Sequence, residues 1–131
     1  MEGSTVAEIG NGYVILVGIG PGDSPANACN MAEKIAHLRV FEDEQGKMNR
    51  SILDVKGEAL VVSQFTLYAD TRKGRRPSFV EAAPPEVASP LVDFLAQQLR
   101  NLGLPSQTGE FGAHMLVEIE NDGPVTILLE L

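Results

Sequence analysis

The fold of this chain is decided by the stretch ALVVSQFTLYAD, residues 59–70. Its first four residues are the most apolar run in the sequence, which is typical of a strand. The run continues into polar residues, beginning with Ser63 and Gln64, and polar groups at a strand end need hydrogen-bonding partners. We therefore expect the central strand at 59–67 and a candidate ligand site at its polar end.

A concentrated patch of positive charge follows this strand. Four of the ten basic residues lie in RKGRR, residues 72–76, although the whole chain carries a net charge of −8. Such a protein can contact phosphates at one place and repels them elsewhere, so it suits the end of a nucleic acid better than a duplex. We interpret the ligand as the acceptor end of a charged tRNA, with Phe79 either stacking on a base or anchoring the loop. A solvated basic loop is the alternative.

The composition indicates one folded domain in a reducing compartment. The chain has 131 residues, of which 44% are hydrophobic, and this is enough to bury a core without disulfides. A single cysteine, Cys29, fits the cytosol. The sequence has neither an apolar segment long enough to cross a bilayer nor a signal-peptide pattern at Met1. We expect a single cytoplasmic domain over 1–131 with no membrane partner.

Residues outside the central strand predict two helices and several further strands. The first helix begins at Ser24-Pro25, where serine caps the helix and proline takes its first position. The second begins at Pro85 and ends before Gly103. Strands are expected at 13–17, buried on both faces, at 40–42, at 51–55 in a hairpin with the central strand, at 114–120 and at 125–129. This order predicts a single α+β domain with a largely antiparallel, barrel-like sheet and two main helices.

Three glycines, Gly18, Gly20 and Gly22, follow the first predicted strand. Their spacing does not match the G-x-G-x-x-G pattern, and no Gly-Lys-Ser/Thr follows them. We interpret the segment as a turn that leads to the first helix rather than as a phosphate-binding loop.

The residue types give little support to metal, triad or acid–base chemistry. No cluster of His, Cys, Asp and Glu has metal-ligand spacing, and neither histidine lies close in sequence to a serine or a cysteine. An enzyme with this sequence would work by positioning its substrate and by backbone hydrogen bonds. On the pattern alone, a solvated strand end at 63–66 and a simple turn at 121–124 remain open as alternatives.

Three motifs occur together in the order found in one known family: SQFTLYAD at 63–70, KGRRPSF at 73–79 and NDGPVT at 121–126. On these motifs the sequence closely resembles the D-aminoacyl-tRNA deacylase family. The resemblance implies hydrolysis of the ester between a D-amino acid and the 3′-terminal adenosine of tRNA, and activity on misplaced glycine as well. It also implies a cytosolic homodimer that needs no metal or other cofactor.

The resemblance further implies which residues form the site. The catalytic group would be Ser63, Gln64, Phe65 and Thr66. A cis Gly-Pro bond placed in the partner's pocket would exclude L-amino acids, with substrate binding and chiral selection by Leu67, Asn121, Gly123, Pro124 and Thr126. The contacts to tRNA would come from Arg72, Lys73, Arg75, Arg76 and Phe79.

The expected mechanism uses backbone N–H groups near Phe65 and Thr66 as donors to the developing negative charge. With no base at hand, the substrate's own 2′-hydroxyl is the expected participant, and Thr66 as a covalent nucleophile is the alternative. The alternative function is a non-catalytic nucleic-acid-binding accessory protein that uses the loop 72–76. Family members usually begin with a further strand, and we expect this chain to lack that strand or to have a misassigned start.

Overall fold

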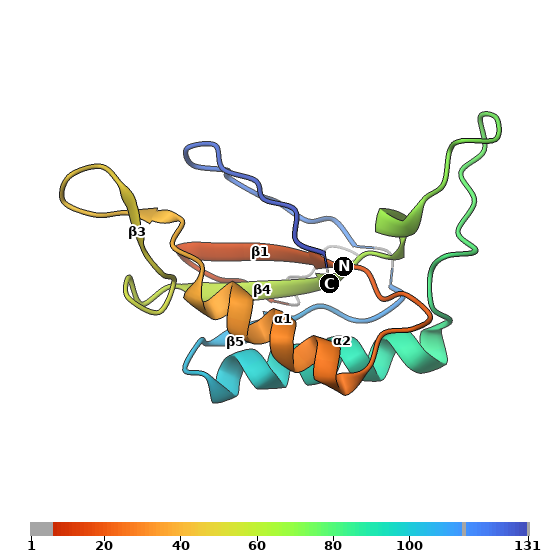
Figure 1. Cartoon of the computed structure of the whole chain (residues 1–131), viewed down its shortest axis with the longest axis horizontal. Helices are drawn as coiled ribbons and strands as arrows, with labels where there is room; N and C mark the ends of the chain where they lie inside the picture. The colour runs from red at the N-terminus through yellow and green to blue at the C-terminus, as the bar shows by residue number, and fades with distance from the viewer. Residues whose placement is uncertain (1–6, 114, 131) are drawn as a thin grey trace.

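Figure 1 shows the computed structural model of the chain, which describes residues 7–113 and 115–130. The main sheet has three strands in the order β1 (Gly12–Val17), β4 (Glu58–Ser63) and β5 (Ser106–Thr108). Both strand pairs are parallel, so the carboxyl ends of all three strands lie at the same edge of the sheet. The polar residues that follow β4 begin at this edge.

Two helices pack against this sheet and against each other. α1 (Pro25–His37) follows β1, and α2 (Pro85–Asn101) connects β4 to β5; the two lie side by side in Figure 1. Within the residues that the structure describes, no helix is long and apolar enough to cross a membrane. The core lies between the helices and the sheet and consists of Ala32, Ile35, Ile52, Ala59, Val61, Val92, Leu95, Ala96, Leu99 and Leu104.

A second, two-stranded sheet projects from one end of the molecule (Figure 1). It pairs β2 (Phe41–Glu42) with β3 (Met48–Arg50) in antiparallel fashion. The short strand predicted at 40–42 is confirmed, one residue shorter than expected.

The expected α+β domain with two main helices is confirmed, but the largely antiparallel, barrel-like sheet is wrong. The main sheet is parallel, and the described residues form no barrel. The physical reason is the connectivity. A helix lies between β1 and β4 and another between β4 and β5, and a crossover through a helix brings the next strand back in the same direction.

The strand predicted at 51–55, and its hairpin with the central strand, are also wrong. The Ser51 N–H donates to the Asp54 carboxylate at 2.8 Å, and the Asp54 N–H donates to the Ser51 hydroxyl at 3.2 Å. This reciprocal pair is the arrangement of a capping box, which starts a helical turn. The turn closes when the Val55 N–H donates to the Ser51 carbonyl at 3.2 Å. Local side-chain bonds therefore override the β-branched pattern.

The two strands predicted near the carboxyl end, 114–120 and 125–129, are not strands in the part of the chain that the structure describes. Position 114 itself lies outside the described residues. The alternation is partly reflected in burial, because Met115 and Val117 are half-buried. Alternation of apolar and polar residues indicates an extended segment with one apolar face. It does not show that a second strand lies beside the segment to form the hydrogen bonds of a sheet. The prediction missed β5, which has only three residues.

β1 confirms the position of the first predicted strand but not its burial. Leu16 is 45% exposed, whereas Tyr13, Ile15 and Val17 pack against the core. Because successive side chains of a strand point to opposite faces, only one face of β1 is covered.

Both helix starts and the end of α2 follow the predicted signals. The Ser24 hydroxyl accepts a hydrogen bond from the Asn27 N–H, and the Asn27 side chain accepts one from the Ser24 N–H at 3.2 Å. Pro25 and Pro85 take the first positions of the two helices. Gly103 has a φ of +97°, a left-handed conformation that glycine adopts without steric cost when it ends a helix.

Candidate functional site

The polar end of β4 leaves the sheet at Ser63 and turns into a short 3-10 helix, η1 (Phe65–Tyr68). The predicted strand over 59–67 is therefore wrong at its carboxyl end. The Gln64 N–H donates to the Val17 carbonyl at 2.7 Å, which ties this turn to the end of β1. The polar segment thus lies at the edge of the sheet where two parallel strands end.

The first turn of η1 leaves two backbone donors without partners. The N–H groups of Leu67 and Ala69 donate to the carbonyls of Gln64 and Thr66. Within the described residues, no acceptor is found for the N–H groups of Phe65 and Thr66, as is usual for the first donors of a helix. Both residues are exposed. A carbonyl oxygen brought to this turn could accept from both.

The predicted catalytic side chains are close to one another. The Gln64 side-chain amide donates to the Thr66 hydroxyl oxygen. Ser63 and Gln64 are half-buried, and Leu67 is 50% exposed. Ser63 also lines a cavity of only about 10 Å³ together with Phe111 and other residues of α2 and the segment after β5. A cavity of this size holds no amino acid, so the site of a single chain is an open surface.

A larger cavity lies elsewhere in the described residues. It has a volume of about 270 Å³ and is lined by Ile9, Glu58, Arg100, Pro105, Ser106 and Gln107. Glu58 begins β4 and Ser63 ends it, so this cavity lies at the opposite edge of the sheet from η1. None of the predicted site residues lines it.

The basic loop begins and ends at a backbone bridge between Asp70 and Ser78. The Asp70 N–H donates to the Ser78 carbonyl at 2.7 Å, and the Ser78 N–H donates to the Asp70 carbonyl at 2.8 Å. Residues 71–77 beyond this bridge are all exposed. The loop is therefore closed at its base and open to solvent at its tip.

The charges of this loop are not equivalent. The Asp70 carboxylate accepts from the Arg72 Nε at 2.9 Å, from Nη2 at 2.7 Å and from the Arg72 backbone N–H at 3.0 Å. These hydrogen bonds, the side-chain ones first, lower the pKa of Asp70 to about 2. No ion pair with another described residue is found for Lys73, Arg75 or Arg76. These three cations can meet phosphate without breaking an ion pair, whereas the Arg72 guanidinium, although 83% exposed, is paired with Asp70.

Phe79 joins the loop to η1. Its ring packs edge-on against the Phe65 ring with 4.9 Å between centroids and 68° between planes. Phe79 is half-buried. Of the two roles that the sequence left open for Phe79, this contact favours the anchor.

The third motif forms a turn around a cis peptide bond between Gly123 and Pro124, which is the isomer that the resemblance implied. The Asn121 side-chain amide donates to the Thr126 hydroxyl at 3.0 Å, and its oxygen accepts from the Val125 N–H at 3.2 Å. Asn121 and Thr126 therefore hold the turn closed. All residues from 121 to 128 are exposed.

Within one chain, the structure brings together only part of the predicted site. Figure 1 shows η1 and the basic loop on the right of the view, and the turn of 121–126 on the left. The catalytic group and the cations are neighbours, and Leu67 belongs to η1. The remaining residues assigned to chiral selection lie far from them.

Sequence reasoning missed the support beneath η1. The ring of Tyr68 lies against Gly18 and Gly20, which were interpreted as a simple turn. The available signal was the alternation of glycines directly after a strand, because it leaves one side of the backbone bare. The pairing of Asp70 with Arg72 was also missed, although an acid two residues before an arginine is a common turn contact.

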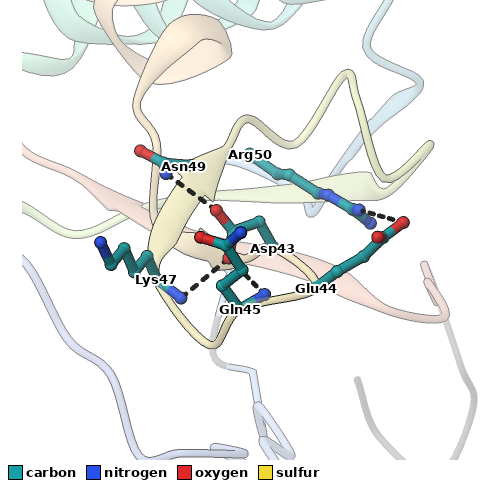
Figure 2. Close-up of polar contacts among 6 residues, drawn as sticks. All are labelled: Asp43, Glu44, Gln45, Lys47, Asn49 and Arg50. Atoms are coloured by element: carbon teal, nitrogen blue, oxygen red, sulfur yellow. Dashed lines mark hydrogen bonds and ion pairs between the residues drawn. The ribbon is translucent and has the colours of Figure 1, made fainter.

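A second polar cluster belongs to the hairpin between β2 and β3 (Figure 2). The Asp43 carboxylate accepts from the Asn49 side-chain amide at 2.8 Å and from the N–H groups of Gln45 and Lys47 at 2.8 and 3.0 Å. These bonds, that of Asn49 first, lower the pKa of Asp43. The carboxylate is occupied in shaping the turn. In residues 7–113 and 115–130, no group of three or more His, Cys, Asp or Glu side chains could hold a metal ion.

The matching family model and two similar relatives are each described as a deacylase acting on tRNA. The family model described as D-Tyr-tRNA(Tyr) deacylase matches residues 1–130. The chain is 65% identical over 130 residues to the D-aminoacyl-tRNA deacylase of Thermomicrobium roseum, covering 99% of this chain and 84% of that protein. It is also 65% identical over 130 residues to the D-aminoacyl-tRNA deacylase of Heliobacterium modesticaldum, covering 99% of this chain and 87% of that protein.

Two solved structures share the fold. One, described as c-Myc DNA Unwinding Element Binding Protein, matches with a TM-score of 0.89 and 44% identity over 98% of this chain and 87% of that chain. The other, a probable eukaryotic D-amino acid tRNA deacylase, matches with a TM-score of 0.68 and 15% identity over 83% of this chain and 81% of that chain. At 15% identity the second likeness concerns the fold alone.

Proposed function

The chain belongs to the D-Tyr-tRNA(Tyr) deacylase family, and from this premise we propose that it hydrolyses D-aminoacyl-tRNA. The products are free tRNA and a D-amino acid, and glycine misplaced on tRNA is a further substrate. The observation that carries the proposal is the pair of N–H groups of Phe65 and Thr66, which have no acceptor among the described residues and lie beside the Gln64 side chain.

These two donors fit the charge that develops in ester hydrolysis. Water adds to the ester carbonyl carbon, and negative charge develops on the carbonyl oxygen. Two N–H groups aimed at that oxygen stabilise the transition state, and one such donor is typically worth about a hundredfold or more in rate. The bond from the carbonyl carbon to the ribose 3′-oxygen then breaks, and that oxygen takes up the proton that the attacking water has lost. The neighbouring 2′-hydroxyl of the substrate assists, so the protein needs no base of its own.

The basic loop fits the phosphates next to the terminal adenosine. Lys73, Arg75 and Arg76 carry the electrostatic contact, because the Arg72 guanidinium is engaged by Asp70. Three phosphate contacts give a modest affinity that weakens as salt rises. We expect recognition of a tRNA end rather than of a long duplex.

Chiral selection is proposed to require a second copy of the chain. The turn at Gly123 and Pro124 is exposed and lies far from η1 in its own chain (Figure 1), which supports a role as a wall for the pocket of another protomer. The segment that carries this turn also exposes apolar side chains: Leu116 is 82% exposed and Leu128 is 76% exposed. Exposed aliphatic residues of this kind are typical of an interface. The proposed assembly is a homodimer whose protomers exchange these turns.

The test is a paired hydrolysis assay on D-tyrosyl-tRNA and L-tyrosyl-tRNA with the purified chain. We expect release of D-tyrosine and sparing of the L-ester. Equal hydrolysis of both esters would contradict the proposed wall, and release of neither would contradict the proposed activity.

A second candidate is a nucleic-acid-binding protein without turnover. The 44% identical solved structure is described as a binding protein for a DNA unwinding element, and the basic loop offers four exposed cations, of which Arg72 is paired with Asp70. Under this candidate the chain would retain nucleic acid in a gel-shift assay and leave D-tyrosyl-tRNA intact. Turnover of the D-ester decides for the esterase.

A further inference from the structure

The ring of Tyr68 packs closely against the loop after β1 because two residues of that loop, Gly18 and Gly20, have no side chain. A Cβ atom added at Gly18 would lie 3.0 Å from Tyr68 Cε2 and 3.2 Å from Leu67 Cβ. One added at Gly20 would lie 2.9 Å from the Tyr68 hydroxyl oxygen and 3.3 Å from Cζ. Such distances are too short for ordinary carbon contacts. The ring therefore lies directly on the bare backbone of Gly18 and Gly20.

The loop beneath the ring is itself held in place. The Gly20 N–H donates to the Asp23 carboxylate at 2.7 Å, and the Asp23 N–H donates back to the Gly20 carbonyl at 3.1 Å. Gly20 is buried. Because these bonds fix the turn immediately before α1, the backbone cannot easily withdraw from an added side chain.

The same short loop holds both ends of the segment that carries the site. The Val17 carbonyl accepts from the Gln64 N–H at 2.7 Å, just before η1. The Ile19 carbonyl accepts from the Ala83 N–H at 2.8 Å, after the basic loop. Between these two bonds, the Tyr68 ring packs on the two glycines and supports η1 against the loop.

We infer that Gly18 and Gly20 are positioning residues for the hydrolysis, because they seat the Tyr68 ring and thereby fix where the N–H groups of Phe65 and Thr66 point. This inference rests on the proposed function. The glycines touch no substrate and act through Tyr68. Their role is to keep the donor pair at the depth that the transition state requires.

An added methyl group at Gly20 would push the ring, and η1 with it, outward by a few tenths of an ångström. Misplacement of catalytic groups by about 1 Å can cost about a hundredfold in rate, so a smaller shift is expected to cost about tenfold. The oxyanion exists only in the transition state, so the loss should appear in kcat and leave KM within about twofold.

The first experiment compares Gly20→Ala with Gly22→Ala in D-tyrosyl-tRNA hydrolysis. Gly22 lies in the same turn and is exposed, and a Cβ atom there would meet nothing within 4 Å. We expect kcat to fall about tenfold in Gly20→Ala and to stay unchanged in Gly22→Ala. Circular dichroism and the melting temperature check that both variants fold, and Gly18→Ala replaces Gly20→Ala if the latter does not.

The second experiment adds Tyr68→Phe to Gly20→Ala. The closest contact of the added Cβ is the Tyr68 hydroxyl, and its removal leaves contacts of 3.3 and 3.4 Å to ring carbons. We expect the double variant to recover most of the lost kcat, which gives a positive coupling in a double-mutant cycle with Tyr68→Phe alone. A general loss of stability would not be rescued by removing one hydroxyl group.

A third readout does not depend on activity. The amide resonances of Phe65 and Thr66 should shift in Gly20→Ala and return in the double variant. An unchanged kcat together with unshifted amides in Gly20→Ala overturns the inference and leaves the proposed function standing. A wild-type chain that spares D-tyrosyl-tRNA overturns the proposed function, whereas the amide shifts still report whether the glycines set the position of η1.

Discussion

At the scale of single residues, the Asp70 carboxylate organises the basic loop. The carboxylate accepts three hydrogen bonds from Arg72, and the Asp70 backbone closes the loop through its two hydrogen bonds with Ser78. The four cations of the loop therefore differ in their contacts, although the sequence alone does not distinguish them. Arg72 is held by Asp70, and Lys73, Arg75 and Arg76 are the proposed phosphate contacts.

Arg72→Ala is expected to raise the pKa of Asp70 from about 2 toward the ordinary value of about 3.9. The rise should be incomplete, because the backbone N–H at position 72 still donates to the carboxylate. Since the folded-state pKa is lowered, Asp70 stabilises the loop above about pH 4, and this contribution is lost as the pH falls through about 2. An NMR titration of the carboxyl carbon measures the shift.

Asp43 is the internal control for that titration. Its pKa is lowered by Asn49 and by backbone donors of its own hairpin, so Arg72→Ala should leave the pKa of Asp43 unchanged. A movement of both carboxyl groups would indicate a general change in the protein rather than the loss of one contact.

Thr66→Ala is expected to retain activity within about tenfold of the wild type, because the proposed donors are backbone groups that alanine keeps. The hydroxyl oxygen accepts from the Gln64 side chain, so its loss loosens that amide and accounts for the moderate decrease. Steady-state hydrolysis of D-tyrosyl-tRNA measures it. Near-total loss of activity in a folded variant, with a covalent adduct on wild-type Thr66 seen by mass spectrometry, would establish the nucleophile route instead.

At the scale of elements, the helices depend on local signals and the strands do not. α1 starts where Ser24 and Asn27 cap each other, and Pro25 takes its first position. The parallel pairing of β1 with β4 joins residues 46 positions apart, such as Gly12 with Glu58. The position of η1 also depends on residues distant in sequence, because the Gln64 N–H just before η1 bonds to the Val17 carbonyl at the end of β1.

Ser24→Ala is expected to destabilise the protein by about 1 kcal/mol, the usual cost of losing an N-cap side chain. Asn30→Ala is the matched control on the same helix, since Asn30 is exposed in the interior of α1. Urea unfolding at fixed protein concentration measures both variants. Equal midpoints for the two variants would show that the cap does not hold the start of α1.

The start of α1 and the pairing of β1 with β4 also show which parts of the fold can be predicted from the sequence. Helix starts, the glycine that ends α2 and the polar end of β4 could be predicted, because residues within a few positions determine them. The parallel sheet could not, because alternation of apolar residues says which face is covered but not which strand is the neighbour. The turn at Ser51 competes with a strand through side-chain bonds that a pattern of residue types underestimates.

The candidate site divides in the same way. Its motifs identify Gln64, Thr66 and the basic loop directly, and these residues do lie together. The alternating glycines indicate a bare stretch of backbone, but they do not identify Tyr68 as the side chain that packs on Gly18 and Gly20. This packing arises only when β1 and β4 run parallel and end at the same edge.

At the scale of the whole molecule, the two halves of the proposed site lie at opposite ends of one chain (Figure 1). A second copy brings them together only if the segment of 115–130 is part of the contact. In the proposed assembly, discrimination against L-amino acids should therefore depend on protein concentration, because a protomer without its partner would lack the proposed wall.

Leu128→Lys is expected to shift the protein toward monomer and to weaken discrimination between D- and L-tyrosyl-tRNA. A charge at an exposed aliphatic position opposes association because it would have to be desolvated. Val80→Lys is the control, since Val80 is 78% exposed but follows the basic loop at the other end of the chain. Analytical ultracentrifugation over a range of concentrations measures both.

Two results would count against this assembly. One is a wild-type protein that sediments as a single chain at every concentration yet still spares the L-ester. The other is an identical shift of Leu128→Lys and Val80→Lys, which would point to general solubility rather than to a specific contact.

The bridge between Asp70 and Ser78 has a consequence for changes of sequence. Because it fastens the loop at its base, residues 71–77 can change in length or composition while the body of the protein is untouched. Substitutions at this tip should therefore alter the proposed contacts to tRNA while leaving the core unchanged. The same position offers a place to graft a foreign peptide, such as an affinity handle, with the least disturbance to folding.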